Sequence, residues 1–239
     1  MSLVAWWKLD ETSGTIAHDN KGSNYNGNLV GNPTFVAGKV GNALNFDGAG
    51  DYVLLGNVAD FKIKDKTISF WAKPSVSITA ARPIFSSGTG NYYVGFRGID
   101  GMIVSYANSL GSQKIINSAN SVVPTNEWHF YTYSLEVIGE TVNIKMYVDA
   151  SLIHSISISE GISEVYGSNF VIGTFSISSL FFNGIIDDLR IYDYILIQEE
   201  IDWIYNNGDG QNRAFRSSNK VGRPEPHPIS RIKKRVKLR

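Results

Sequence analysis

Short apolar runs separated by turn residues dominate the hydrophobic pattern of this chain. Most runs are rich in β-branched and aromatic residues, and Gly, Pro, Asn or Asp residues stand between them. The runs cover residues 3–9, 43–46, 52–55, 67–72, 84–86, 92–96, 102–106, 114–117, 128–136, 142–148, 152–157, 170–172 and 185–192. Many short strands at this spacing, with no helices alternating between them, are typical of an antiparallel sandwich or barrel. The pattern therefore predicts an all-β domain.

One helix is predicted after the last of these strands. Ile197, Ile201, Ile204 and Tyr205 recur at helical spacing, and acidic residues occupy the other side. Acidic residues in the first turns also interact favourably with the helix dipole. The pair Asn207-Gly208 supplies a left-handed stop. We expect a short helix that closes the domain and packs one face on the sandwich.

The last predicted strand carries an unusual carboxylate. Strand side chains alternate with period two. One face of this strand would therefore hold Ile185, Asp187, Leu189 and Ile191. A lone carboxylate among core residues is costly to bury unless a positive group compensates it. Arg190, a lysine or a metal ion could compensate Asp187, which makes this residue the first candidate for a site.

Composition supports a filled core and restricts the chemistry. Of the 239 residues, 43% are hydrophobic, 12% aromatic and 18% charged, which argues against disorder over most of the chain. Cysteine is absent, so disulfides, thiolate metal sites and cysteine nucleophiles are excluded. No apolar run approaches the roughly 20 residues of a membrane-spanning helix. No signal peptide is visible before the first strand, so we expect an extracellular or surface location only as part of a longer secreted chain or a virion.

The end of the chain differs in charge from the rest. The formal net charge of zero divides into +9 for residues 213–239 and −9 for residues 1–212. We therefore expect a domain over residues 1–210 and a basic, Pro-containing tail or linker over residues 211–239. The basic cluster of this tail comprises Arg231, Lys233, Lys234, Arg235, Lys237 and Arg239.

Two interpretations of the tail remain open. It can be a solvated tail or a linker, because charge runs are often only solvated. It can also bind an anionic partner such as nucleic acid, lipid or an acidic protein surface, or lie on the acidic body of its own chain.

Several segments resemble a known family and occur in order along residues 3–208. They are VAWWKLDETSG (4–14), DNKGSNYNG (19–27), GKVGNALNFDG (38–48), DYV (51–53), TISFWAKP (67–74), WHF (128–130), GIIDDLRIY (184–192), QEEI (198–201) and YN (205–206). Together they are similar to the laminin-G-like (LamG/pentraxin-type) branch of the concanavalin A-like lectin/glucanase superfamily. The resemblance does not cover the tail.

The resemblance implies an antiparallel jelly-roll β-sandwich of two curved sheets, one concave and one convex, with one short C-terminal helix. It also implies a structural calcium ion that ties an early loop to the last strand, at Asp19, Gly22, Asn24 and Asp187. Calcium takes six to eight oxygen ligands. Asn26 stands where a second loop acid is frequent, which predicts weaker binding. The alternative is that Asp187 pairs with Arg190 or a backbone amide and that no ion binds.

The sequence argues against catalysis. Glycan hydrolases of this superfamily use a close pair of carboxylates with the spacing Glu-x-Asp-x-x-Glu or a near variant, and this chain has no such spacing. Its four histidines show no metal-ligand spacing, and it has no Gly-rich phosphate loop between a strand and a helix. We therefore expect a non-catalytic module.

Binding is the expected activity. Sugar sites combine aromatic platforms with polar groups, because a sugar has an apolar face and a rim of hydroxyls. The candidates at loop edges are Asn91, Tyr92, Tyr93, Arg97 and Tyr106. The leading hypothesis is a carbohydrate or surface-glycan binding module. The alternative is a structural or assembly protein, such as a surface appendage or virion component, which uses the jelly-roll for protein contacts and the tail to anchor to an acidic partner or nucleic acid.

Overall fold

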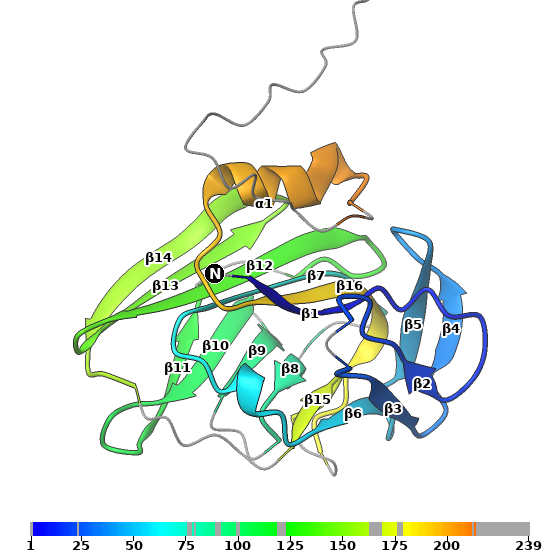
Figure 1. The fold of residues 1–239 in the computed structure, drawn as a ribbon, viewed down its shortest axis with the longest axis horizontal. Helices are drawn as coiled ribbons and strands as arrows, with labels where there is room; N and C mark the ends of the chain where they lie inside the picture. The colour runs from blue at the N-terminus through cyan, green and yellow to red at the C-terminus, as the bar shows by residue number, and fades with distance from the viewer. Residues whose placement is uncertain are drawn as a thin grey trace, which may run out of the picture.

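Two eight-stranded antiparallel sheets stack face to face in a computed structural model of the chain (Figure 1). The structure describes residues 2–22, 24–75, 78, 80–88, 92–98, 101–118, 123–162, 169–175, 179–211 and 213. This arrangement is a jelly-roll β-sandwich, and the predicted fold class is confirmed.

The first sheet, called sheet A, has the order β14-β13-β12-β7-β16-β5-β4, and β1 also pairs with β16. Its strands are β1 (Leu3–Trp7), β4 (Thr34–Ala37), β5 (Asn42–Asp47), β7 (Lys66–Pro74), β12 (His129–Ile138), β13 (Thr141–Val148), β14 (Ser151–Ser159) and β16 (Asn183–Tyr192). The last strand of the chain therefore lies in the middle of sheet A.

The second sheet, called sheet B, has the order β11-β10-β9-β8-β15-β6-β3-β2. Its strands are β2 (Ile16–Ala17), β3 (Gly27–Val30), β6 (Tyr52–Gly56), β8 (Ala81–Ser86), β9 (Tyr92–Arg97), β10 (Met102–Ala107), β11 (Gln113–Asn117) and β15 (Phe170–Ile172). The hydrophobic pattern predicted no strand where β2 and β3 lie. β2 has two residues and β3 has four, too few for a recognisable apolar alternation. Pairing of β2 with β3 and of β3 with β6 places them in the sheet.

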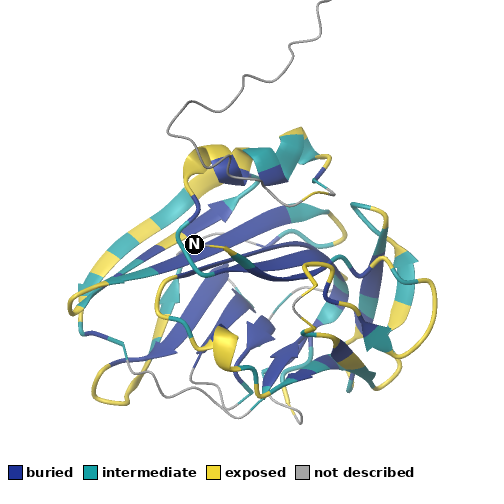
Figure 2. Ribbon diagram, in the orientation of Figure 1, coloured by how far each residue is buried: buried dark blue, intermediate teal, exposed yellow. Residues whose placement is uncertain are grey.

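The hydrophobic core lies between the two sheets, where the ribbon is buried (Figure 2). Aromatic rings fill much of it. Phe70 of sheet A packs at 6.2 Å between ring centroids against Phe96 of sheet B. Phe61, from the short 3-10 helix η1 (Ala59–Phe61), contacts the rings of Trp7 and Phe170. Such ring pairs contribute roughly 0.5–1.5 kcal/mol each beyond area burial, so they stabilise the packing of one sheet on the other.

The predicted helix is α1 (Gln198–Tyr205), which covers the outer face of sheet A (Figure 1). Glu200 accepts a hydrogen bond from the backbone N–H of Ile197 at 3.0 Å and so caps the first turn. Asn206 ends the helix in the left-handed conformation, with φ 49°. Ile201 and Ile204 are buried in a second cluster together with Trp71 of β7. The predicted packing of one helix face on the sandwich is confirmed.

A tight hairpin joins β13 to β14. Asp149 and Ala150 have φ of 49° and 62°, which is the conformation of a two-residue hairpin turn. The Asp149 carboxylate accepts a hydrogen bond from the Phe130 N–H at 2.9 Å and lies 2.7 Å from His129 Nδ1. The side-chain hydrogen bond between His129 and Asp149 raises the pKa of His129. The turn is thereby fixed to the start of β12.

The predicted alternation along the last strand is broken by a β-bulge. The register of β16 against β7 shifts after Asp187, and Asp188 has φ 53°. A bulge adds one residue, so the side chains that follow it change faces. Leu189 and Ile191 join Ile186 in the core between the sheets. The expectation that Asp187 shares their face is therefore wrong, and Asp187 lies on the outer side of sheet A.

Candidate functional site

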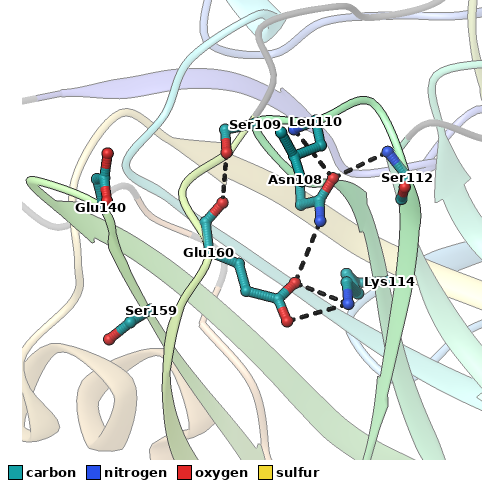
Figure 3. A pocket seen from close by; sticks show the side chains of 8 residues that line it. All are labelled: Asn108, Ser109, Leu110, Ser112, Lys114, Glu140, Ser159 and Glu160. Atoms are coloured by element: carbon teal, nitrogen blue, oxygen red, sulfur yellow. Dashed lines mark hydrogen bonds and ion pairs between the residues drawn. The ribbon is translucent and has the colours of Figure 1, made fainter.

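A polar cavity of about 470 Å³ opens where β11, at one edge of sheet B, approaches the end of β14, at one edge of sheet A (Figure 3). The loop after β10, the turn between β12 and β13, and both edge strands contribute to its wall. The lining residues are Asn108, Ser109, Leu110, Ser112, Lys114, Glu140, Ser159 and Glu160. Charged and hydrogen-bonding side chains thus dominate the cavity.

Glu160 is the centre of the polar contacts in this cavity (Figure 3). Lys114 Nζ lies 3.0 Å from Glu160 Oε1 and 2.8 Å from Oε2. Asn108 Nδ2 donates to Glu160 Oε2 at 3.2 Å. Hydrogen bonds from Lys114 and Asn108 hold the pKa of Glu160 below its ordinary value. The carboxylate is therefore ionised at neutral pH, and its side chain is 34% exposed and open to a ligand.

Local hydrogen bonds of the loop after β10 position the groups around Glu160. Asn108 Oδ1 accepts from the N–H of Leu110 at 3.2 Å and of Ser112 at 2.8 Å, a turn-forming role that suits asparagine. Ser109 Oγ donates to the Glu160 carbonyl oxygen at 2.7 Å. These bonds join the two sheets at the cavity, so its polar groups are in place before any ligand arrives.

Tyr106 belongs to the hydrophobic core and lies next to Lys114 of the cavity wall. Tyr106 and Lys114 are cross-strand partners, and therefore lie on the same face of sheet B. Burial and the charge of Glu160 raise the pKa of Tyr106. Among the described residues, the buried Tyr106 Oη has no hydrogen-bond partner. A fixed hydroxyl group thus lies within electrostatic reach of Glu160.

The structure does not bring the predicted sugar-binding residues together on a surface. Tyr92 and Tyr106 are 2% and 0% exposed, because both point into the core between the sheets, and the expectation that their rings form a platform is wrong. Arg97 lies at the end of β9 on the opposite, outer face, as does Tyr93, which packs against Phe175. Asn91 lies outside the described residues.

No sequence motif predicts the residues that build the cavity. Lys114 and Glu160 are 46 positions apart and belong to different sheets. The only local signal was the turn pattern around Gly111-Ser112, next to Asn108. Topology, and not a motif, brings these side chains together.

Asp19, the first predicted calcium ligand, accepts hydrogen bonds from backbone amides. Its Oδ1 accepts from the N–H of Trp6 and of Lys21, each at 3.0 Å, and its Oδ2 from that of Tyr25 at 3.4 Å. Gly22 and Asn24, in the same loop, have positive φ. This geometry suits a carboxylate that orders the loop.

Asp187, the second predicted calcium ligand, is held at another place. Its Oδ2 accepts hydrogen bonds from the N–H groups of Lys39 and Val40, both at 2.8 Å. Its buried Oδ1 has no partner among the described residues. Burial raises the pKa of Asp187 to about 8, although the two amides oppose the shift.

The two predicted halves of the calcium site do not meet. Trp7 of β1 pairs with Asp19 on one side and with Leu189 of β16 on the other, which separates Asp19 from β16 by about two strand spacings, or roughly 10 Å. The described part of the chain contains no group of three or more His, Cys, Asp or Glu residues placed to hold a metal ion. The residues present therefore do not fit a calcium ion shared by Asp19 and Asp187.

Arg190 pairs with Asp188 and not with Asp187. Its Nη2 lies 2.9 Å from Asp188 Oδ2, and both side chains are almost completely buried. The guanidinium lies 4.3 Å from the centroid of the Trp6 ring. It also donates hydrogen bonds to the carbonyl oxygens of Gln211 and Arg213. The start of the predicted tail is thus fixed to sheet A, whereas its basic cluster over residues 231–239 lies outside the described residues.

The family model described as the Concanavalin A-like lectin/glucanases superfamily matches residues 47–202. This match covers more than half of the chain, and the chain therefore belongs to that superfamily. A comparison with curated proteins found no match. Among the described residues, no helix has the length and apolar character needed to cross a membrane.

Several solved structures share this fold. Domain 4 of AbnA, a GH43 extracellular arabinanase from Geobacillus stearothermophilus, in complex with arabinotriose, has a TM-score of 0.67 at 20% identity over 88% of this chain and 98% of that chain. The binding domain of Paraclostridial Mosquitocidal Protein 1 has a TM-score of 0.70 at 15% identity, over 86% of this chain and 52% of that chain. The botulinum neurotoxin type G receptor binding domain has a TM-score of 0.65 at 15% identity, over 86% and 51%. The chain thus spans about half of these toxin domains, and at such identities the likeness shows the fold.

Proposed function

We propose that this domain is a non-catalytic module that binds carbohydrate, presented as a glycan or on a cell surface. The observation that carries the proposal is the cavity around Glu160, where a carboxylate, an ammonium group and an amide meet at 2.8–3.2 Å. Sugar hydroxyls both donate and accept hydrogen bonds, so they can engage all three groups. The complex of the similar arabinanase domain with arabinotriose supports a sugar as the ligand, although fold alone does not define function.

The chemistry of the cavity supports binding rather than hydrolysis. A glycosidase acid must hold a proton near neutral pH and therefore has a raised pKa. Lys114 and Asn108 shift the pKa of Glu160 in the opposite direction. A carboxylate that stays ionised is suited to accept hydrogen bonds from a bound sugar. We place this activity outside the cell or on a surface, where the similar arabinanase also acts according to its name.

Titration of the 239-residue chain with arabinotriose, followed by a glycan array, tests the proposal. We expect saturable binding that weakens in Lys114→Met, because this change removes a donor from the cavity. Lys145→Met is the matched control, since Lys145 is exposed on β13 outside the cavity. A glycan array without any bound glycan would contradict the proposed function.

A further inference from the structure

The charges that line the cavity favour one class of glycan. Lys114 and Glu160 form an ion pair and largely compensate each other. Glu140 adds a second carboxylate to the same wall, so the charged side chains among the described lining residues sum to a formal net charge of −1. A concave site with this excess repels anions and does not repel neutral molecules. The cavity therefore disfavours sugars that carry carboxylate or sulfate groups.

The hydrogen-bonding groups of the cavity also favour a particular arrangement of hydroxyls on the ligand. Glu160 offers two acceptor oxygens, and the donors Lys114 Nζ and Asn108 Nδ2 lie beside them. Two hydroxyls on adjacent carbons can each donate to one carboxylate oxygen and accept from one neighbouring donor. Hydrogen bonds to a charged partner are stronger than those between neutral groups. The arrangement is thus complementary to a vicinal diol.

One large apolar side chain belongs to the described part of the cavity wall. Leu110 belongs to the cavity wall and is 87% exposed. A sugar whose hydroxyls point toward Glu160 can place its C–H face on such a side chain. Among the described residues that line the cavity there is no aromatic ring, so recognition by them depends on the hydrogen bonds around the carboxylate.

We infer that the cavity selects neutral glycans with vicinal hydroxyls over acidic glycans, and that Glu160 determines this selectivity. The inference rests on the proposed function, because it names the class of ligand for the same site. It assigns to Asn108, Lys114 and Glu160 the recognition of the diol, and to Glu140 a repulsive role toward anionic sugars.

Paired titrations with a neutral and an acidic trisaccharide test the inference. Arabinotriose is the neutral probe and trigalacturonate the acidic one, each titrated into the full chain by isothermal calorimetry. We expect arabinotriose to bind at least about tenfold more tightly. Glu160→Gln keeps the shape of the side chain and removes its charge. It should weaken arabinotriose binding roughly tenfold, in line with the strength of hydrogen bonds to charged groups, and should narrow the gap between the two sugars.

The control variant is Glu199→Gln, which removes an acidic residue from the exposed side of α1 and should leave both affinities unchanged. Melting temperatures of all variants confirm that each is folded. Equal or tighter binding of trigalacturonate, or arabinotriose binding that Glu160→Gln leaves unchanged, would overturn the inference while the proposed function stands. Absence of binding to every neutral and acidic oligosaccharide would instead overturn the proposed function.

Discussion

At the scale of single residues, the two carboxyl oxygens of Asp187 have different surroundings. Two backbone N–H groups, from Lys39 and Val40, satisfy one of its oxygens, whereas the other oxygen has no partner among the described residues. Burial raises the pKa of Asp187 to about 8. The folded protein therefore binds a proton at this position more strongly than the unfolded chain, in which the pKa of Asp187 is near its ordinary value of 3.8.

Replacement of Asp187 by asparagine should change how stability depends on pH. With a folded pKa above the unfolded one, the contribution of Asp187 to stability is greatest below about pH 4 and declines until about pH 8. In Asp187→Asn the amide oxygen can still accept from both N–H groups, and no charge is buried. The melting temperature of the variant relative to the wild type should therefore rise between pH 5 and about pH 8, as measured by circular dichroism.

The matched control for this measurement is Asp193→Asn, because Asp193 follows β16 outside the buried stretch. Its melting-temperature difference from the wild type should show no comparable rise. A difference for Asp187→Asn that stays constant across the same pH range would show that Asp187 is ionised in the folded protein throughout.

At the scale of elements, the β13–β14 hairpin carries a backbone strain that a single substitution should relieve. Ala150 has φ 62°, a conformation that costs an L-residue roughly 1–2 kcal/mol. Glycine adopts it freely but loses roughly 0.5–1 kcal/mol of chain entropy on folding. Ala150→Gly should therefore stabilise the domain by about 0.5–1 kcal/mol in urea unfolding. The same Ala→Gly change at Ala107, the buried last residue of β10, should destabilise the domain instead.

Asp188 and Arg190 form a buried ion pair at the bulge of β16. Their contributions to the free energy of unfolding should therefore not be additive. Arg190→Met leaves Asp188 buried without its cation, and removing one partner of such a pair costs roughly 3–5 kcal/mol. The same variant loses the hydrogen bonds to Gln211 and Arg213. Urea unfolding should show a smaller loss for the double variant Asp188→Asn/Arg190→Met than for Arg190→Met alone. Equal losses would mean that the charge of Asp188 is compensated elsewhere.

The elements also show which patterns carry structural information in this chain. The apolar spacing of Ile201 and Ile204 predicted α1, because a helix on a sheet buries one continuous stripe. The face of Asp187 was mispredicted because a bulge adds a residue without any local sequence signal. The cavity was missed because Lys114 and Glu160 meet only through the packing of two sheets. Local periodicity thus predicts elements well, whereas sites made between distant edges require the three-dimensional arrangement.

At the scale of the whole molecule, the melting temperature in calcium and in EDTA tests whether one ion links the early loop to the last strand. Because Asp19 and Asp187 are held by separate sets of amides, we expect the same melting temperature in calcium and in EDTA. An ion that binds only the folded state raises the melting temperature by mass action. A calcium-dependent rise that disappears in Asp187→Ala would confirm the ion that the resemblance implies, and would contradict the present placement of the two carboxylates.

The central position of β16 determines when sheet A can be completed during synthesis. Synthesis proceeds from the N-terminus, so β1, β5 and β7 are complete long before residues 183–192 exist, yet all three pair with β16. Until then, the strand edges that will receive β16 are open, and open edges favour pairing with other chains. Sheet A can therefore be completed only late in translation. A chain that is truncated before β16 keeps these edges open and is prone to aggregate.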